Sequence, residues 1–197
     1  MMMSEQISAL QHELAEERRA RQALVESSVR LNSLLNLPEL LSAIIESVAT
    51  LLDAETSSLL LLDEETNELT FAVATGESGE SVRELRVPAD RGIAGWVLAH
   101  SETLRIADVA GDERFYGQID QSSGFQTRSM LAVPLTIRDR PIGVIEAINK
   151  QGDGGFTERD EDLAVAFAAQ SAVAIDNARL YRQLADAVVE SRLSYRL

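Results

Sequence analysis

The stretch from 142 to 163, IGVIEAINKQGDGGFTERDEDL, constrains the fold of this chain more than any other. Its β-branched start predicts a strand, and the Gly- and Asp-rich run at 151–155 predicts a loop. Thr157 and Asp160 then have nearly the spacing of a capping box, and apolar residues recur beyond them at helical intervals. This stretch therefore predicts the end of a sheet, a tight loop and the start of a long helix.

Five residues in this stretch, called the lock set below, have a spacing that favours a bridge between strand and helix: Asn149, Lys150, Phe156, Asp160 and Glu161. Lys150 ends the predicted strand and Asp160 opens the predicted helix. We therefore expect an ion pair between them to hold the two elements together across the loop, with Phe156 packed beneath. We interpret the lock set as structural rather than as a set of ligand contacts.

Composition and charge exclude several classes of function. The 197 residues predict one domain with extensions, and a net charge of −14 argues against a nucleic-acid-binding surface. The sequence contains no cysteine, which excludes disulfides and thiolate chemistry. No nucleophile–base pair, metal-ligand spacing or P-loop stands out, so we expect neither an enzyme nor a metal site. No apolar run is long enough to span a membrane and no signal pattern begins the chain, so we expect a cytoplasmic protein.

Both ends of the chain are predicted to be helices that extend beyond a central domain at 37–178. Residues 1–36 carry an interrupted heptad seam, which favours a dimerising coiled coil; a lone solvated helix or an expression remnant is the alternative. A long helix is predicted from 158 to about 192, and the extension at 179–197 continues an amphipathic stripe. We expect these helices to pair with a second copy or to lead into an effector domain.

The central domain alternates between helix and strand patterns. An amphipathic helix is predicted from Pro38 to Leu52, and a second helix begins within 90–97 and ends near His100. Gly92 and Gly95 leave the N–H groups at that helix start open to an anion, or simply allow close packing. Strands are predicted at 57–63, 68–75, 85–87, 104–106, 129–137 and 142–150.

Two features of the domain leave alternatives open. Residues 107–128, called the covering segment below, are irregular and rich in hydroxyl and aromatic side chains. They either cover a pocket or form a solvated connection. Glu146 interrupts a predicted central strand, where an unpaired carboxylate is costly. Its side chain therefore faces either solvent or a ligand pocket.

Together these segments resemble a GAF domain over residues ~38–185. The resemblance is carried by SSLLLLD, PADRGIAGWV, FYGQIDQSSGFQTRSMLAVPL, IGVIEAINK and F-x3-DED. The lock set is similar to the NKFDE motif of GAF domains from cyclic-nucleotide phosphodiesterases and cyanobacterial adenylyl cyclases. The resemblance implies an α/β, PAS-related fold. In it, a central antiparallel sheet of five or six strands carries helices on one face and a ligand pocket on the other.

The resemblance also implies a small-molecule site, with cyclic AMP or cyclic GMP as the first candidate. Ser58 falls on the sheet floor, Ile93 and Ala94 fall at a helix start that receives the cyclic phosphate, and Glu146 falls beneath the pocket. Ala74 and Thr75 stand where guanosine-selective members present an aromatic and a carboxylate. The full set of implied ligand contacts is Ser58, Ala74, Thr75, Ile93, Ala94, Tyr116, Asp120, Ser123, Thr127 and Glu146.

The function we expect is that of a sensory regulatory domain. Its ligand occupancy would be transmitted through a helical homodimer to an effector domain or to a kinase or cyclase partner. The alternative is a ligand-free, GAF-like dimerisation module of a larger signalling protein. Without cysteine, neither the covalent bilin of phytochrome-like GAF domains nor the chemistry of the free methionine sulfoxide reductases is available.

Overall fold

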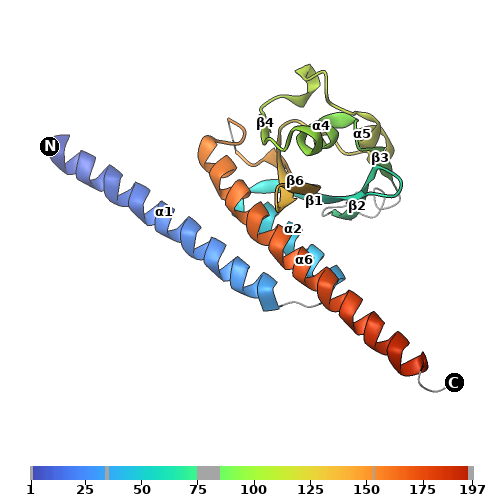
Figure 1. Ribbon diagram of the computed structural model, residues 1–197. Helices are drawn as coiled ribbons and strands as arrows, with labels where there is room; N and C mark the ends of the chain where they lie inside the picture. The colour runs from blue at the N-terminus through green and yellow to red at the C-terminus, as the bar shows by residue number, and fades with distance from the viewer. Residues whose placement is uncertain (1, 34–35, 75–84, 153, 195–197) are drawn as a thin grey trace.

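A mixed α/β fold is built on an antiparallel sheet. The structure, a computed structural model, describes residues 2–33, 36–74, 85–152 and 154–194. In this part of the chain six strands pair in the order β3-β2-β1-β6-β5-β4 (Figure 1). Every neighbouring pair is antiparallel. The strands are β1 Ala54–Asp63, β2 Glu68–Ala74, β3 Arg86–Pro88, β4 Leu104–Ile106, β5 Met130–Ile137 and β6 Arg140–Lys150.

The predicted strands are confirmed, with ends that shift by up to three residues. The largest shift is at the start of β1, which begins at Ala54 because Ala54 pairs with Lys150 at the end of β6. β1 and β6 lie at the centre of the sheet, and their apolar runs pack on both sides. Leu59 and Leu61 belong to one hydrophobic cluster, whereas Leu60 belongs to the other. This alternation of side chains along a strand gives the sheet two buried faces.

Three helices lie on the side of the first face of the sheet, two of them packed on the strands and the third packed on those two helices. They are α1 (Met2–Ser33), α2 (Leu37–Leu51) and α6 (Glu158–Ser194). The apolar residues of α2 pack on β1, and α6 packs on β5 and on α2. Leu40, Ile44, Phe167 and Ile175 are fully buried in the cluster that results. This cluster is the main core of the domain.

The second face of the sheet is covered by shorter elements. Helix α4 (Gly92–His100) packs on β5 and β6. The covering segment follows β4 and contains the 3-10 helix η1 (Val109–Gly111) and the short helix α5 (Gln118–Ser123). A second hydrophobic cluster fills the space between these elements and the sheet. The long helices therefore lie on one side as expected. The other face is covered by α4 and the covering segment, which together are called the roof below.

The terminal helices extend past the sheet. The N-terminal part of α1 and the C-terminal part of α6 project from opposite sides of the domain (Figure 1). The two helices touch where Arg159 of α6 lies 3.2 Å from Glu16 of α1, and Leu24 of α1 packs against the main core. None of the described helices is both long and apolar enough to cross a membrane.

Candidate functional site

The strand-to-helix junction is built by the lock set. Lys150 Nζ at the end of β6 lies 3.0 Å from Asp160 Oδ1 in the first turn of α6, and it donates a second hydrogen bond to the carbonyl of Leu52. Phe156 is buried in the main core. Thr157 N–H and Thr157 Oγ1 both donate to Asp160 Oδ2, while Asp160 N–H donates back to Thr157 Oγ1. This reciprocal arrangement is that of a capping box, with Asp in place of Glu.

The carboxyl of Asp160 is held in its charged form. Burial opposes ionisation, but the hydrogen bonds from Thr157 and Lys150 and the charge of Lys150 outweigh it. The pKa of Asp160 therefore lies below its ordinary value. The last member of the lock set, Glu161, faces outward and accepts a hydrogen bond of 3.1 Å from Arg105 Nε on β4. The lock set thus ties α6 to β6 through Lys150 and to β4 through Arg105.

Asn149 is a special position at the end of β6. Its side chain is buried, and its φ of 58° lies in the left-handed region that Asn tolerates better than most residues. Arg128 N–H and Ser129 N–H donate to its Oδ1, while its Nδ2 donates to the Gln126 carbonyl and to Glu55 Oε2. The amide therefore holds the C-terminal end of the covering segment against β6 and β1.

On the second face of the sheet, the pairing of strands places four residues side by side in a row. Ser58 on β1 is opposite Ala74 on β2 and Glu146 on β6, and Glu146 is opposite Ala132 on β5. Ala74 and Ala132 contribute to the second hydrophobic cluster, as do Leu60 and Val144, two positions along from Ser58 and Glu146. These four residues, Ala74, Ser58, Glu146 and Ala132, are called the floor row below. In it one polar pair lies between two alanines, beneath the roof.

The polar pair is buried. Glu146 is 7% exposed, and Ser58 Oγ donates a hydrogen bond of 2.7 Å to Glu146 Oε2. Burial raises the pKa of Glu146 above its ordinary value, and the Ser58 hydrogen bond offsets only part of that rise. Of the two orientations open from sequence, the one toward solvent is wrong, because the roof excludes water from this side chain.

The start of α4 lies over the same face. Ile93 and Ala94 are buried, and the first N–H groups of a helix have no partner within the helix. The side chain of Arg91, at the N-cap position, does not cap them. Gly95 allows the helix to approach the preceding turn, because a Cβ there would lie 2.9 Å from the Ala89 carbonyl oxygen. Backbone donors at a helix N-terminus attract anions.

The covering segment is closed on itself by its own hydrogen bonds. Asp120 accepts from Thr127 N–H and from Thr127 Oγ1, at 2.7 Å each, so α5 is tied to the end of the segment. Val109 N–H donates to the Arg128 carbonyl at 2.9 Å, which brings the two ends of the segment together. Tyr116 packs against the second hydrophobic cluster beside Gly92. The segment is therefore folded over the second face of the sheet, which favours a cover over a solvated connection, the two alternatives open from sequence.

Two of the residues implied by the resemblance cannot be placed fully. Thr75 lies outside the described residues, and Ser123 belongs to α5 but its side chain is not among those described. The remaining implied ligand contacts lie on the floor row, at the start of α4 or in the covering segment. The structure thus gathers them around one face of the sheet.

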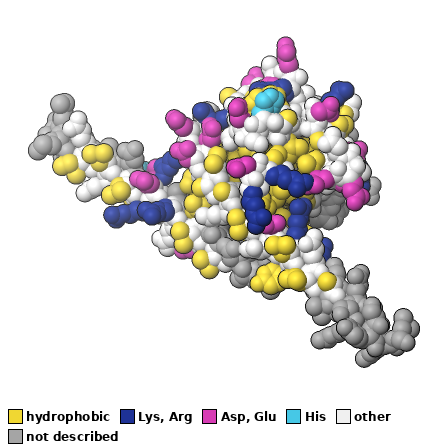
Figure 2. Space-filling view, in the orientation of Figure 1, with side chains coloured by type: hydrophobic (Ala, Val, Ile, Leu, Met, Phe, Trp, Pro, Cys, Tyr) yellow, Lys and Arg dark blue, Asp and Glu magenta, His cyan; other side chains and the backbone are white. Residues whose placement is uncertain are grey.

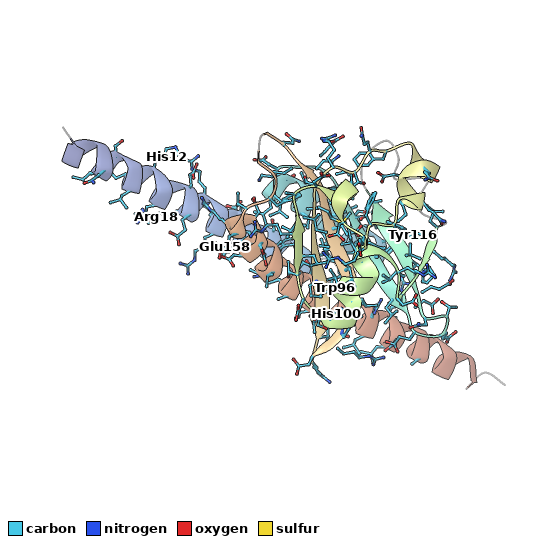
Figure 3. All side chains as sticks on the ribbon, turned by 90° about the horizontal axis from the view of Figure 1, so that it is seen from above. His12, Arg18, Trp96, His100, Tyr116 and Glu158 are labelled. Carbon is cyan, nitrogen blue, oxygen red and sulfur yellow. The ribbon has the colours of Figure 1, made fainter. Side chains whose placement is uncertain are left out.

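One cluster at the rim of the roof was not foreseen from sequence. Trp96 and His100 stack one turn apart on α4, with ring centroids 4.0 Å apart (Figure 3). The Arg114 guanidinium of the covering segment lies 5.0 Å from the Trp96 ring centroid and pairs with Asp112. The only signal in the sequence is the helical spacing of Trp96 and His100. Among the described residues, no group of three or more His, Asp or Glu side chains is placed to hold a metal ion.

The fold and this covered face define a class of protein: an α/β domain whose antiparallel sheet is covered on both faces and which carries long terminal helices. The family model described as GAF domain matches residues 36–175. The chain therefore belongs to the GAF domain family. The α/β fold expected from the resemblance is confirmed.

Two curated relatives in sequence are named as cyclic-nucleotide phosphodiesterases. A probable 3′,5′-cyclic phosphodiesterase of Caenorhabditis elegans is 35% identical over 156 residues, which cover 75% of this chain and 21% of the relative. A dual 3′,5′-cyclic-AMP and -GMP phosphodiesterase 11A of Takifugu rubripes is 34% identical over 175 residues, covering 84% of this chain and 19% of the relative. The chain thus spans about a fifth of the length of these relatives.

Solved structures with the same fold come from several kinds of protein. The GAF domain of a phosphoenolpyruvate-protein phosphotransferase from Coxiella burnetii superposes with a TM-score of 0.76 at 21% identity, covering 83% of this chain and 96% of that one. The corresponding Acinetobacter domain gives 0.70 at 26% identity, with coverage of 81% and 93%. A free methionine-R-sulfoxide reductase from Neisseria meningitidis, solved with its substrate, gives 0.68 at 21% identity, with coverage of 82% and 91%. The first and third of these likenesses show the fold alone.

Proposed function

We propose that this GAF domain is a sensory regulatory domain that binds a cyclic nucleotide between the floor row and the covering segment. The observation that carries the proposal is the buried Ser58–Glu146 pair. A buried carboxyl in a central sheet is costly when only one hydroxyl pairs with it, so it is an expected place for a functional contact. The two phosphodiesterase relatives support a cyclic nucleotide as the ligand.

The arrangement suits a ligand that carries one negative charge and several hydrogen-bonding groups. The N–H groups of Ile93 and Ala94 at the start of α4 would receive the cyclic phosphate, since a helix N-terminus favours an anion. The raised pKa of Glu146 favours a neutral carboxyl, which repels an anionic ligand less than a carboxylate does. Asp120 and Thr127 would contact the ligand from the roof. Ser123 and Tyr116 are proposed contacts of the same kind, as are Ala74 and Thr75 from the sheet side.

Calorimetry and thermal unfolding with cyclic AMP and cyclic GMP test this proposal directly. We expect heat of binding and a rise in Tm with one or both cyclic nucleotides, and neither effect with 5′-AMP or 5′-GMP. Glu146→Gln keeps the shape of the floor row, and we expect it to change the affinity. Glu68→Gln, at the partly exposed first residue of β2, is the matched control and should bind like the wild type. Absence of heat and of a Tm shift at millimolar nucleotide would refute ligand binding.

We also propose that the terminal helices pair with those of a second copy and transmit occupancy to an effector domain or to a kinase or cyclase partner. Large apolar side chains are exposed on α1 and on the distal part of α6, as the hydrophobic surface of both helices shows (Figure 2). A soluble helix rarely leaves such a stripe uncovered. The exposed residues are Ile7, Leu10, Leu14, Val25 and Val29 on α1, and Leu180, Tyr181 and Leu184 on α6.

The oligomeric state tests this second part of the proposal. Sedimentation equilibrium of the whole chain should give a dimer, and Leu10→Glu combined with Leu184→Glu should give a monomer. Arg18→Glu, an exposed change of charge on α1, is the control for charge alone. In this proposal the domain works in the cytoplasm and has no catalytic step of its own. A wild-type protein that sediments as a monomer would contradict it.

A second candidate function is a dimerisation module that binds no ligand. The observation that favours it is the close packing of the second face, where Phe115, Tyr116 and Ile119 of the covering segment already contact the apolar cluster on the sheet. Roof and floor would then be permanently closed. Calorimetry separates the two candidates, because both give a dimer by sedimentation but the ligand-free module gives no heat with either cyclic nucleotide.

A further inference from the structure

Asn149 and Lys150, adjacent residues at the end of β6, form side-chain hydrogen bonds with different parts of the domain. Asn149 holds the covering segment, whereas Lys150 holds the start of α6 and the end of α2. Adjacent residues of one strand share a peptide group, so neither can shift far without moving the other. The roof over the second face and the helices on the first face therefore meet at this point of the chain.

The contacts of Asn149 use the full hydrogen-bonding capacity of its amide. Its Oδ1 accepts at 2.7 Å from Arg128 N–H and at 3.2 Å from Ser129 N–H. Its Nδ2 donates at 2.9 Å to the Gln126 carbonyl and at 3.0 Å to Glu55 Oε2. An amide offers two acceptor sites and two donor hydrogens, so all four are occupied. Because Asn149 is only 1% exposed, water does not compete for these partners while the segment stays in place.

The end of the covering segment is attached to β6 through the Asn149 side chain, which binds the backbone of Gln126 and Arg128. The segment's start is fixed to the same end, because Val109 N–H donates to the Arg128 carbonyl. Arg128 also pairs with Glu55, the acceptor that Asn149 Nδ2 uses. A displacement of residues 126–128 must therefore break the bonds of Asn149 or drag its backbone along.

The contacts of Lys150 lead in the opposite direction. Its ammonium group donates at 2.8 Å to the Leu52 carbonyl just beyond α2 and at 3.0 Å to Asp160 in the first turn of α6. Both charged side chains are mostly buried, with 17% exposure for Lys150 and 11% for Asp160. A rotation of the β6 backbone at this point would be transmitted to both helices.

We propose that Asn149 and Lys150 form a mechanical junction through which the position of the covering segment is passed to α6. The junction consists of these two residues and their hydrogen-bond partners. A covering segment that closes keeps the Asn149 amide fully bonded and the first turn of α6 ordered. A segment that opens releases both. This proposal rests on the proposed function only in treating the covering segment as the part that a ligand moves.

Hydrogen–deuterium exchange on the whole chain, without added ligand, tests the junction. Asn149→Gly deletes the side chain but keeps the freedom to adopt a positive φ. We expect exchange in residues 107–128 to rise by about fivefold or more, roughly the effect of one net hydrogen bond. We also expect a measurable rise in residues 158–166 of α6, which Asn149 does not touch. Lys150→Met should raise exchange in the same two segments, with the larger effect in α6.

Asn67→Gly is the matched control. Asn67 has a φ of 55° in the exposed turn between β1 and β2, so the same substitution is made at the same backbone conformation away from the junction. It should leave both segments unchanged. If Asn149→Gly does not fold, Glu55→Ala takes its place, because Glu55 is exposed and accepts a hydrogen bond from the same amide. It should cause a smaller rise in both segments.

Two results would overturn the proposal. The first is a rise confined to 107–128 in Asn149→Gly and to 158–166 in Lys150→Met. The second is an equal rise in every segment, β5 included, which would indicate general loss of stability. A separate measurement repeats the exchange with a cyclic nucleotide added. If a cyclic nucleotide binds, it should slow exchange in 158–166 of the wild type and not of Asn149→Gly. If none binds, the proposed function fails while the ligand-free comparison still decides the junction.

Discussion

Ser58 and Glu146 face each other across the pairing of β1 and β6 and share a buried hydrogen bond of 2.7 Å. A carboxyl in this position has left water and has gained one hydroxyl donor in return. Its charged form is disfavoured for that reason, and its pKa is raised. Burial of this carboxyl therefore lowers the stability of the domain, and the size of this loss depends on pH.

Glu146→Gln should remove that dependence. A carboxyl whose pKa is higher in the folded than in the unfolded protein binds more protons when folded, so its contribution to stability is present at low pH. The contribution is lost as pH rises from the ordinary pKa of 4.5 through the raised folded value. At neutral pH we expect Glu146→Gln to be more stable than the wild type by about 1–3 kcal/mol.

Urea unfolding from acid to neutral pH measures this difference. The gap between Glu146→Gln and the wild type should narrow as the pH falls toward the ordinary pKa. Ser58→Ala removes the one hydroxyl partner and should destabilise the protein more at neutral than at acid pH. A constant gap at every pH would mean that Glu146 does not titrate differently in the folded state.

Lys150→Met should destabilise the domain strongly. The substitution keeps most of the aliphatic length but leaves the Asp160 carboxylate and the Leu52 carbonyl without the ammonium donor. Removing one partner of a fully buried ion pair costs about 3–5 kcal/mol. This pair is mostly buried, so we expect a loss of about 2–4 kcal/mol. Chemical unfolding measures the loss. Arg105→Met breaks the exposed pair with Glu161, and it should cost no more than about 1 kcal/mol.

Asp160→Asn should change how the stability of the domain depends on pH in the acid range. The folded pKa of Asp160 is lowered, so its contribution is complete above the ordinary pKa and is lost as pH falls through the folded value. Wild-type stability should therefore fall as the pH drops below the ordinary pKa of 3.8, and part of that fall should be missing in Asp160→Asn. Thermal unfolding from neutral to acid pH is the measurement. Parallel curves for the two proteins would show that another group causes the acid transition.

The elements of the fold were accessible from sequence because they depend on local patterns. The start of α6 at Glu158 and the bounds of β4 at 104–106 agree with the expected positions. Helix caps, glycine-rich loops and apolar periodicity act within a few residues of one another. The ion pair of Lys150 and Asp160 is also local, since it spans a single loop.

The candidate site was less accessible, because its contacts depend on strand register. A slip of one residue between β1 and β6 would turn Ser58 away from Glu146, and no local pattern sets that register. The contact of Asn149 with Glu55 joins residues that are 94 positions apart. The implied ligand contacts came instead from resemblance to the family, and the structure gathers those that it describes without testing their role.

Gly95→Ala should weaken both the domain and any ligand site at the start of α4. A Cβ at this position would lie 2.9 Å from the Ala89 carbonyl oxygen and 3.0 Å from the Asp90 carbonyl carbon, which are backbone atoms that cannot rotate away. The helix start must then shift from the turn before it, at a cost of about 1–3 kcal/mol. Gly111→Ala is the matched control, because a Cβ there meets no atom within 4 Å. Thermal unfolding and cyclic-nucleotide calorimetry on both variants separate the two effects. Equal stability of Gly95→Ala and Gly111→Ala would show that the close approach of α4 to this turn is not required.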